Sequence, residues 1–320
     1  MSNRIVLTRL LTEAAMSAAR DLPGELVVLG EGTPGRSALL SAVSGASAIM
    51  SLVTERIDDE VLAAAGPGLR IVANVAAGVD NIDLAAAARR GVTVSNTPGV
   101  LDDATADLTL ALILASTRRV VEADRFLRAG NSWMWGPKEW IGLQLSAGTT
   151  LGIVGLGRIG MAVARRARAF GVRIVATGSR ASGDEAVALD VEAVDLDDLF
   201  ALSDIVTLHC PLTPDTRGLV DAPRLATMRR GSYLINTGRG PLVDENALAD
   251  ALESGRIAGA GLDVHEQEPL VNERLRASER VVLLPHIGSA GAATRDAMGR
   301  LAVQNVAEVL AGRSPLTPVR

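Results

Sequence analysis

Three residues in the second half of the sequence carry side chains that together could bind a charged substrate and give it a proton. Arg239, Glu268 and His286 each stand in a loop after a short apolar run of strand type. A guanidinium binds a carboxylate through a rigid fork of donors, an imidazolium acts as a general acid toward a carbonyl oxygen, and a neighbouring carboxylate favours the charged imidazole. Reduction of a 2-keto acid needs these three functions. Taken singly, the same residues could be a surface ion pair, a solvated carboxylate and a helix cap.

The sequence also contains a motif that could hold the hydride donor. Residues 151–154 are an apolar run typical of a buried strand, Gly155, Gly157 and Gly160 form G-x-G-x-x-G, and residues 161–169 are an Ala/Arg-rich helical stretch. The first glycine allows a sharp turn, the second lets a pyrophosphate approach the backbone, and the third lets the helix pack on the strand. The phosphates then meet the free N–H groups of the helix N-terminus. A strand before the motif and a helix after it favour a dinucleotide site over a glycine-rich turn without a ligand.

The end of the next strand predicts which dinucleotide is bound. Proteins that use NAD place an Asp or Glu about 20 residues beyond the motif, where it binds the ribose 2′-hydroxyl. Gly178 stands 18 residues after Gly160, and the next carboxylate is Asp184. Ser179 and Arg180 offer a hydroxyl and a guanidinium that suit a 2′-phosphate. We therefore predict NADP(H) in preference to NAD(H), the alternative being that Arg180 is a solvated loop charge.

Composition argues against several other classes of protein. The net charge is −5 without a basic block, which argues against nucleic acid as a partner. The most apolar run, residues 108–115, is too short to span a membrane.

The single cysteine, Cys210, excludes an intrachain disulfide and a multi-cysteine metal site. Lys138 is the only lysine and Tyr233 the only tyrosine, so a Tyr-x-x-x-Lys hydride-transfer site is excluded. The N-terminus is of strand type rather than a signal peptide, and we expect a cytoplasmic protein without a metal.

Short apolar runs alternate with Ala-rich helical runs along the whole chain. This alternation predicts α/β architecture with parallel sheets covered on both faces, and 320 residues are enough for two domains. We expect one long helix over residues 104–129, crossing between the domains, and a last helix over residues 294–311 that returns to the first domain. The expected strands are residues 5–7, 26–29, 48–50, 71–73, 92–94, 151–154, 173–177, 204–209, 232–236, 257–263 and 281–284.

Ligands of such folds bind beyond the carboxyl ends of the strands. In the first half, Asn74-Val-Ala-Ala-Gly-Val-Asp and Asn96-Thr-Pro-Gly follow two expected strands. The backbone N–H groups of Ala77 and Gly78 could hold a carboxylate, although two glycine turns would give the same spacing. Among the other two histidines, we expect His209 to shape a cofactor loop and His265 to pack.

All three tryptophans, Trp133, Trp135 and Trp140, lie between residues 131 and 142. In a chain with only 2% aromatic residues, this cluster is either a local satellite core or a contact between subunits. We favour the contact, because tryptophan is over-represented at interfaces.

Together these segments resemble the D-2-hydroxyacid dehydrogenase family. The match runs from about residue 70 to the end, in the motifs Leu151 to Gly160, His209-Cys-Pro-Leu-Thr, Asn236-Thr-Gly-Arg-Gly, Gly261-Leu-Asp-Val with Glu268-Pro, and Pro285-His-Ile-Gly-Ser-Ala. The resemblance implies that Arg239, Glu268 and His286 are the catalytic arginine, glutamate and histidine. It also implies two doubly wound, Rossmann-like domains. Residues 1–99 and 288–320 would form a flavodoxin-like substrate domain, and residues 100–287 the dinucleotide-binding domain.

The resemblance further implies a homodimer built through the cofactor domains, with Ala77 and Gly78 holding the substrate carboxylate. Within the family the chain is most similar to NADP-dependent glyoxylate/hydroxypyruvate reductases, and Trp140 matches a tryptophan that reaches into the partner subunit's substrate site. His265 is a departure, because the family usually has an aromatic residue there. From the motifs and the resemblance together, the predicted cofactor contacts are Thr105, Gly155, Leu156, Gly157, Arg158, Ile159, Gly160, Ser179, Arg180, His209, Cys210, Pro211, Thr216, Thr237, Gly238, Asp263, His286, Gly288 and Ser289.

A second function from another class is a non-catalytic, NAD(P)-sensing relative like the corepressors that share this fold. Such a protein binds its partners through surface grooves and needs no turnover. The intact set of Arg239, Glu268 and His286 argues against it.

Overall fold

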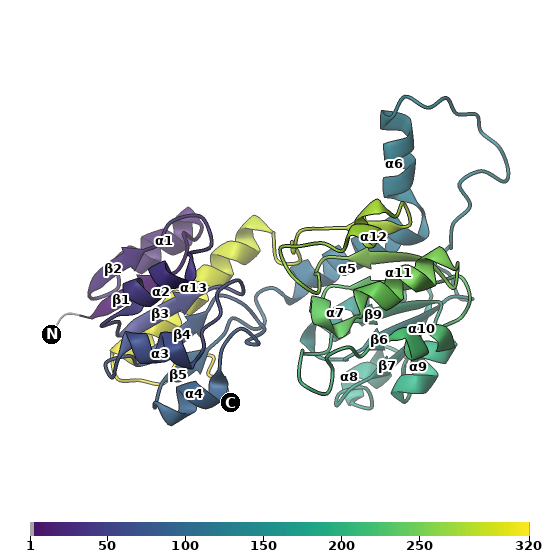
Figure 1. Cartoon of the computed structure of the whole chain (residues 1–320). Coiled ribbons are helices and arrows are strands. Elements are labelled where there is room, and N and C mark those ends of the chain that lie inside the picture. The colour runs from purple at the N-terminus through teal and green to yellow at the C-terminus, as the bar shows by residue number, and fades with distance from the viewer. Residues whose placement is uncertain (1–2, 320) are drawn as a thin grey trace. The chain divides into compact units, whose positions relative to one another are not determined.

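The computed structural model describes residues 3–319, which form two compact units (Figure 1). The first unit consists of Met1–Leu101 and Ser289–Arg320, and the second is Asp102–Gly288. Each unit contains one sheet of parallel strands with helices packed on it, five strands in the first unit and seven in the second. The predicted fold class of two parallel-sheet α/β domains is therefore confirmed.

The sheet of the first unit has the strand order β2-β1-β3-β4-β5. Because side chains alternate between the two faces of a strand, Val6, Ile49 and Val72 share a buried cluster with helices α2, α3 and α4. On the opposite face, α13 packs on β3, β4 and α1. The strands are β1 (Arg4–Leu7), β2 (Glu25–Val28), β3 (Ala48–Ser51), β4 (Ile71–Asn74) and β5 (Thr93–Ser95), and the helices are α1 (Glu13–Arg20), α2 (Arg36–Val43), α3 (Asp59–Ala65), α4 (Leu84–Arg89) and α13 (Ala292–Leu310).

The sheet of the second unit has the order β12-β11-β10-β9-β6-β7-β8, which places the first strand, β6, between β7 and β9. This reversal beside the first strand is the point where dinucleotides bind in such sheets. One buried cluster joins the sheet to α5 and α7, and another joins it to α9, α10 and α11. The strands are β6 (Thr150–Val154), β7 (Arg173–Thr177), β8 (Val191–Ala193), β9 (Ile205–Leu208), β10 (Ser232–Asn236), β11 (Ile257–Leu262) and β12 (Val281–Leu283). The helices are α5 (Asp102–Thr117), α6 (Val120–Arg128), α7 (Arg158–Ala167), α8 (Asp184–Ala188), α9 (Leu196–Leu202), α10 (Ala222–Thr227), α11 (Glu245–Glu253), α12 (Glu273–Ala277) and the 3-10 turns η1 (Arg168–Phe170) and η2 (Gly240–Leu242).

The prediction of one helix over residues 104–129 is wrong, because the structure has two helices, α5 and α6, in its place. Arg119, between them, has a left-handed backbone with φ 55°. The carbonyl of Thr117 accepts the N–H of Leu143 at 2.9 Å, so it bonds the returning chain instead of the next helical turn. Gly142 allows this approach, since a Cβ there would collide with the Thr117 carbonyl. Helix α5 packs within the second unit, on α7, β10 and β11.

Other boundaries also differ from the predicted ones. Helix α7 begins at Arg158 with Gly157 as its N-cap, so Gly160 lies inside the first turn rather than before the helix. Strand β8 was not among the predicted strands. Strand β8 has three residues and buries only Val191, which leaves too little alternation to detect.

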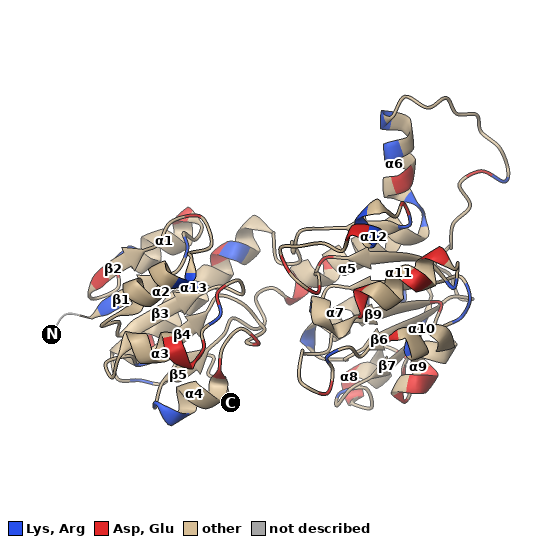
Figure 2. Ribbon diagram, in the orientation of Figure 1, with Lys and Arg blue, Asp and Glu red and all other residues tan. Residues whose placement is uncertain are grey.

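Charged residues of both signs lie interspersed on the helices and loops of each unit (Figure 2). Arg36 contacts Asp58 and Glu60 in the first unit, for example. Exposed pairs of this kind contribute about 0–1 kcal/mol each, so they compensate charge locally more than they stabilise the fold. Within residues 3–319, none of the helices is long and apolar enough to cross a membrane.

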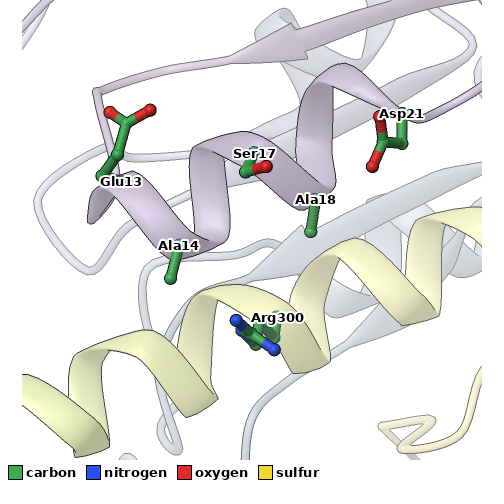
Figure 3. A pocket seen from close by; sticks show the side chains of 6 residues that line it. All are labelled: Glu13, Ala14, Ser17, Ala18, Asp21 and Arg300. Carbon is green, nitrogen blue, oxygen red and sulfur yellow. The ribbon is translucent and has the colours of Figure 1, made fainter.

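A hollow of about 460 Å³ lies between α1 and α13 in the first unit (Figure 3). Small residues allow the two helices to approach, since a Cβ at Gly299 would collide with Ala15. The predicted site residues do not line the hollow. Its lining side chains are Glu13, Ala14, Ser17, Ala18, Asp21 and Arg300.

Candidate active site

The three predicted catalytic residues stand after three neighbouring strands of the second unit. Arg239 follows β10, Glu268 lies in the loop after β11, and His286 follows β12. These strands pair with each other in the order β10-β11-β12. The carboxyl ends of neighbouring parallel strands meet at one edge of the sheet, so the topology brings the three loops together.

Glu268 and His286 are in direct contact. The Nδ1–H of His286 donates to Oε2 of Glu268 at 2.9 Å, and the two side chains are 30% and 33% exposed, respectively. Burial raises the pKa of Glu268, but the hydrogen bond and charge of His286 outweigh it and hold that pKa below its usual range. The carboxylate therefore stays ionised at neutral pH. With Nδ1 engaged, Nε2 is the atom of His286 that can exchange a proton with a substrate.

The backbone of His286 is held in an uncommon conformation by Asp263. His286 has φ 55°, a left-handed value that costs a non-glycine residue about 1–2 kcal/mol. The N–H of His286 donates to the Asp263 carbonyl at 2.8 Å, and the N–H groups of Ile287 and Gly288 donate to the two carboxylate oxygens at 2.7 Å each. Burial raises the pKa of Asp263, and these two hydrogen bonds offset part of that rise. Asp263 was predicted as a cofactor contact, and the structure shows that its carboxylate positions the His286 loop.

Arg239 lies in a turn that the side chain of Asn236 closes. Asn236 donates its Nδ2 to the Arg239 carbonyl at 2.9 Å and accepts the N–H of Gly238 at 3.0 Å. The next residue, Gly240, packs directly on the backbone of His265, where a Cβ would collide. The loop of Arg239 is thus fixed against the loop that carries Glu268.

His265 is buried, as predicted for a packing residue, and it joins the loops of Glu268 and His286. Its N–H donates to Oε1 of Glu268 at 3.2 Å, and its Nε2–H donates to the carbonyl of Leu284 at 3.0 Å, two residues before His286. The buried Glu245 lies 3.8 Å from the other ring nitrogen.

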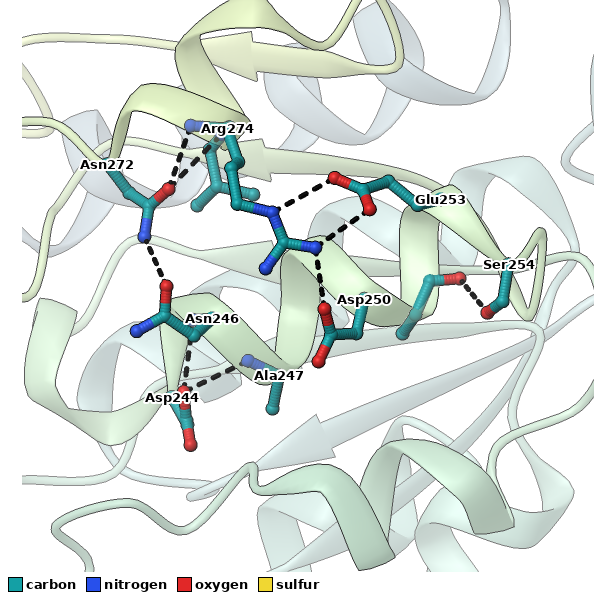
Figure 4. A network of polar contacts seen from close by, with 10 residues as sticks. Asp244, Asn246, Ala247, Asp250, Glu253, Ser254, Asn272 and Arg274 are labelled. Atoms are coloured by element: carbon teal, nitrogen blue, oxygen red, sulfur yellow. Dashed lines mark hydrogen bonds and ion pairs between the residues drawn. The ribbon is translucent and has the colours of Figure 1, made fainter.

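The far end of the Glu268 loop is tied to α11 by polar contacts (Figure 4). Asn272, the N-cap of α12, donates to Asn246 at 3.1 Å. Arg274 reaches from α12 to both Asp250 and Glu253 on α11. The loop is therefore anchored on both sides of Glu268.

Changing Glu268 to Gln should move the alkaline limb of the kcat/KM profile for reduction to lower pH. The histidine charge lowers the pKa of Glu268, so by reciprocity the carboxylate stabilises the protonated histidine, and Gln removes that stabilisation. The measurement is the pH dependence of kcat/KM. Glu266→Gln, at an exposed carboxylate of the same loop, is the matched control and should leave the profile in place. An unmoved limb with a wild-type rate in Glu268→Gln would show that the pair is not coupled.

The three motif glycines occupy different surroundings. A Cβ at Gly155, which has φ 93°, would lie 2.5 Å from the backbone nitrogen of Cys210, and one at Gly160 would collide with the Gly155 carbonyl. At Gly157 a Cβ would meet nothing within 4 Å. Gly155 and Gly160 are therefore needed for packing, while Gly157 leaves an open approach to the start of α7, where Arg158 and Ile159 form the first turn. The N–H groups of Gly155 and Leu156 donate to the Thr177 carbonyl, which brings the end of β7 beside the motif.

The remaining predicted cofactor residues of the second unit lie mainly in strand-end loops. Nε2 of His209 lies 2.9 Å from Oγ1 of Thr207, and burial lowers the pKa of His209 to about 3, so the ring is neutral. Burial raises the pKa of Cys210 to about 11, so it remains a thiol. The hydroxyl of Thr216 donates to the Pro211 carbonyl at 2.7 Å and closes that loop. Thr105 of α5 packs under Gly288. The hydroxyl oxygens of Thr237 and Thr109 are 2.9 Å apart. Ser179 and Arg180 are exposed.

The predicted substrate residues Ala77 and Gly78 belong to the first unit, in the loop after β4, and are partly exposed. Ser289 also belongs to the first unit, at its re-entry point. Two asparagines hold the loop after β4: Asn96 donates to the Ala77 carbonyl at 2.7 Å and Asn74 donates to the Gly78 carbonyl at 2.9 Å.

Comparison with known proteins identifies the family of this chain. Residues 110–288 match the family described as "D-isomer specific 2-hydroxyacid dehydrogenase, NAD binding domain". The chain belongs to this family. It is an oxidoreductase, and its second unit binds a nicotinamide dinucleotide.

Relatives of this dehydrogenase match it over most of their length. A glyoxylate reductase of Pyrococcus horikoshii is 44% identical over 325 residues, covering 100% of this chain and 96% of that protein. A glyoxylate reductase of Thermococcus litoralis is 46% identical over 287 residues, covering 88% of this chain and 86% of that protein. Among solved structures, an NADPH-dependent glyoxylate/hydroxypyruvate reductase from Sinorhizobium meliloti, in complex with NADP and malonate, has a TM-score of 0.85 at 34% identity, and the match covers 99% of this chain and 96% of that one.

The tryptophan segment of the dehydrogenase stands apart from the core of its second unit. Helix α6 has no buried residue, and the chain after it projects from the unit before returning to β6 (Figure 1). Trp133, Met134 and Trp135 are 67%, 85% and 79% exposed. Trp140 instead packs edge-on against Phe126 at 5.2 Å and lies under the guanidinium of Arg119 at 4.9 Å. Trp140 therefore contacts α6 and the residue before it within its own chain, whereas Trp133 and Trp135 are exposed.

Several residues that shape this dehydrogenase's loops were not predicted to have a role. Asn74, Asn96, Asn236 and Glu245 each bond the backbone of a loop that carries a predicted site residue. The positions of the asparagines in the sequence partly indicated this role, because each stands at or directly after the carboxyl end of a strand.

Proposed function

We propose that this dehydrogenase reduces a small 2-keto acid of the glyoxylate/hydroxypyruvate type to the D-2-hydroxy acid, using NADPH. The observation that carries the proposal is the Glu268–His286 pair, set beside the Arg239 loop in the unit that binds the dinucleotide. The names of the glyoxylate reductases that match the whole chain support the choice of substrate.

In the proposed reaction each residue has one task. When bound, the nicotinamide supplies the hydride that adds to the carbonyl carbon. His286, protonated at both ring nitrogens, gives the Nε2 proton to the carbonyl oxygen and becomes neutral. Glu268 stabilises the charged ring before that transfer, and Arg239 binds the substrate and polarises its carbonyl. We assign the first unit to the substrate, with Ala77 and Gly78 holding its carboxylate.

Steady-state kinetics with a short panel of 2-keto acids and both reduced dinucleotides tests this function. The expected result is oxidation of the dinucleotide that depends on the keto acid. A protein that binds the dinucleotide tightly but turns over none of the panel would instead be the sensing, corepressor-like relative.

For the dinucleotide we propose NADP(H) over NAD(H), on the basis of the loop after β7. Gly178, Ser179 and Arg180 are exposed there, and Gly155 and Leu156 bond the end of the strand, so the loop lies close to the dinucleotide motif. The 2′-phosphate would meet the Ser179 hydroxyl and the Arg180 guanidinium. The NADP in the similar Sinorhizobium meliloti reductase supports this choice.

Changing Arg180 to Ala should raise the KM for NADPH about tenfold and leave the KM for NADH within about twofold, because only NADPH carries the 2′-phosphate. Gly178→Asp is a poor converse test, since Gly178 has φ 124° and a Cβ there would lie 3.0 Å from the Leu156 nitrogen. Ser179→Asp places the repelling carboxylate at a position without that strain and should shift preference toward NADH. Arg217→Ala, at another loop arginine of the same unit, is the control. A wild-type kcat/KM that is higher with NADH would refute the assignment.

We also propose that the protein is a homodimer in which the segment α6 to residue 142 contacts the second copy. Exposed Trp133, Met134 and Trp135 give that segment the apolar surface that an interface needs. Trp140 remains our candidate for the residue that reaches the partner's substrate, and Trp140→Phe should then raise the KM for the keto acid.

Changing Trp135 to Ala should weaken dimerisation about 30-fold or more, as measured by sedimentation over a range of concentrations, since a central tryptophan contributes about 2 kcal/mol or more. Leu270→Ala, at an exposed apolar residue of the same unit outside this stretch of sequence, should leave the dissociation constant unchanged. Equal dissociation constants for the two variants would remove Trp135 from the interface.

A further inference from the structure

The loop after β4 has three consecutive backbone carbonyls, and each accepts a hydrogen bond from another residue of the first unit. The Ala76 carbonyl accepts the N–H of Thr97 at 2.7 Å. The Ala77 carbonyl accepts Nδ2 of Asn96 at 2.7 Å, and the Gly78 carbonyl accepts Nδ2 of Asn74 at 2.9 Å. In an extended segment successive carbonyls point in opposite directions. This run of three carbonyls is therefore bent, and the Thr97 N–H and the two asparagine side chains hold the bend.

The orientation of the carbonyls decides where the N–H groups point. The C=O and N–H of a trans peptide point in opposite directions, and the cis peptide among the described residues is Glu268-Pro269. The N–H groups of Ala77, Gly78 and Val79 are therefore directed away from the donors that hold the carbonyls. These three residues are partly exposed, whereas Asn74 and Ala76 are buried. Successive backbone N–H groups in a turn can form a concave site for an anion.

The two asparagines are themselves rigidly held. Asn74 is fully buried, and its Oδ1 accepts the Ser51 hydroxyl at 2.9 Å while its Nδ2 also donates to Asn81 at 3.0 Å. The backbone of Asn96 is bonded on both sides by Thr317, whose N–H and hydroxyl are in turn tied to Asn305 of α13. The Asn74 amide therefore has a single orientation, with its NH₂ group toward the loop, and the backbone of Asn96 is fixed where its Nδ2 meets the Ala77 carbonyl.

We propose that Asn74 and Asn96 are positioning residues for the reaction, which aim the N–H groups of Ala77, Gly78 and Val79 at the carboxylate of the keto acid. The inference rests on the proposed function. Both side chains are neutral donors, and an aspartate at either position would repel the carbonyl it now holds and the substrate as well. The small side chains of Ala77 and Gly78 leave the N–H groups open to the anion.

Asn96→Ala tests the proposal in the full-length protein. The KM for glyoxylate and the inhibition constant for oxamate should both rise about tenfold, the change expected when an orienting hydrogen bond is lost. The KM for NADPH and kcat should stay within about twofold. Asn96→Asp keeps the shape of the side chain and reverses the polarity at Nδ2, so it should raise both carboxylate constants further.

Asn3→Ala is the matched control, because Asn3 also donates Nδ2 to a backbone carbonyl of the first unit, that of Pro23 at 3.0 Å. A purely structural role of Asn96 would lower the melting temperature in both alanine variants and leave the carboxylate constants equal to the control. That result, or a loss confined to kcat, overturns the inference. If Asn96→Ala does not fold, the carboxylate constants of Asn96→Asp decide the inference. If the wild-type protein reduces no 2-keto acid with either dinucleotide, the proposed function fails instead.

Discussion

His286→Gln should lower kcat for keto-acid reduction by about 10²–10⁴-fold, the usual contribution of a general acid. The amide of Gln cannot deliver a proton to the carbonyl oxygen, and the Glu268 carboxylate loses the charged ring that it now stabilises. The affinity for NADPH, measured by fluorescence titration, should stay near the wild-type value, because the imidazole acts at the reacting end of the substrate.

The left-handed backbone at position 286 calls for a second variant. Asn tolerates φ values near 55° better than other non-glycine residues, so His286→Asn removes the acid without adding strain. Equal losses in the Gln and Asn variants would assign the effect to proton transfer. Retention of a tenth of kcat in either variant would exclude His286 as the acid.

Exchanging the glycines of the dinucleotide motif for alanine should separate stability from binding. Gly160→Ala should destabilise the protein by about 1–3 kcal/mol, because its Cβ would overlap the Gly155 carbonyl. Gly157→Ala should change the free energy of unfolding by no more than about 0.5 kcal/mol, since its Cβ would lie in open space. The same methyl group stands where the pyrophosphate approaches, so the Kd for NADPH should rise at least about tenfold.

Thermal unfolding without ligand and titration with NADPH measure the two effects independently. Gly157 serves as the control for Gly160, because both are in the same turn and receive the same methyl group. Normal NADPH binding by Gly157→Ala would show that the pyrophosphate lies elsewhere.

The sheets could be predicted because their strands are short, continuously apolar runs. Residues 71–73 and 232–236 are examples, since nearly every side chain in them is buried between two helical layers. The break between α5 and α6 could not be predicted in this way. It depends on a hydrogen bond from Leu143 to Thr117, across 26 residues, and Arg119 is no helix breaker by type. Strand β8 was missed because one buried valine is not a pattern.

The catalytic candidates could be predicted for a related reason. Arg239, Glu268 and His286 follow strands, and parallel strands bring their carboxyl ends together, so topology alone predicts their proximity. What the sequence could not show is how each loop is held. The Asp263 carboxylate bonds N–H groups 24 and 25 residues away, and Asn96 bonds a carbonyl 19 residues earlier. The positive φ of Gly178, which makes it unsuited to an aspartate, likewise depends on the folded backbone.

The segment after α6 also decides what the protein's intrinsic fluorescence can report. All three indoles of the chain, Trp133, Trp135 and Trp140, lie on this segment and none lies in either buried core. Emission at tryptophan wavelengths will therefore follow the local environment of the segment, including its burial against another molecule, and will be insensitive to melting of the two sheets. Tyr233, on β10, is the tyrosine that reports on the second unit's interior, and circular dichroism is the probe that follows both units.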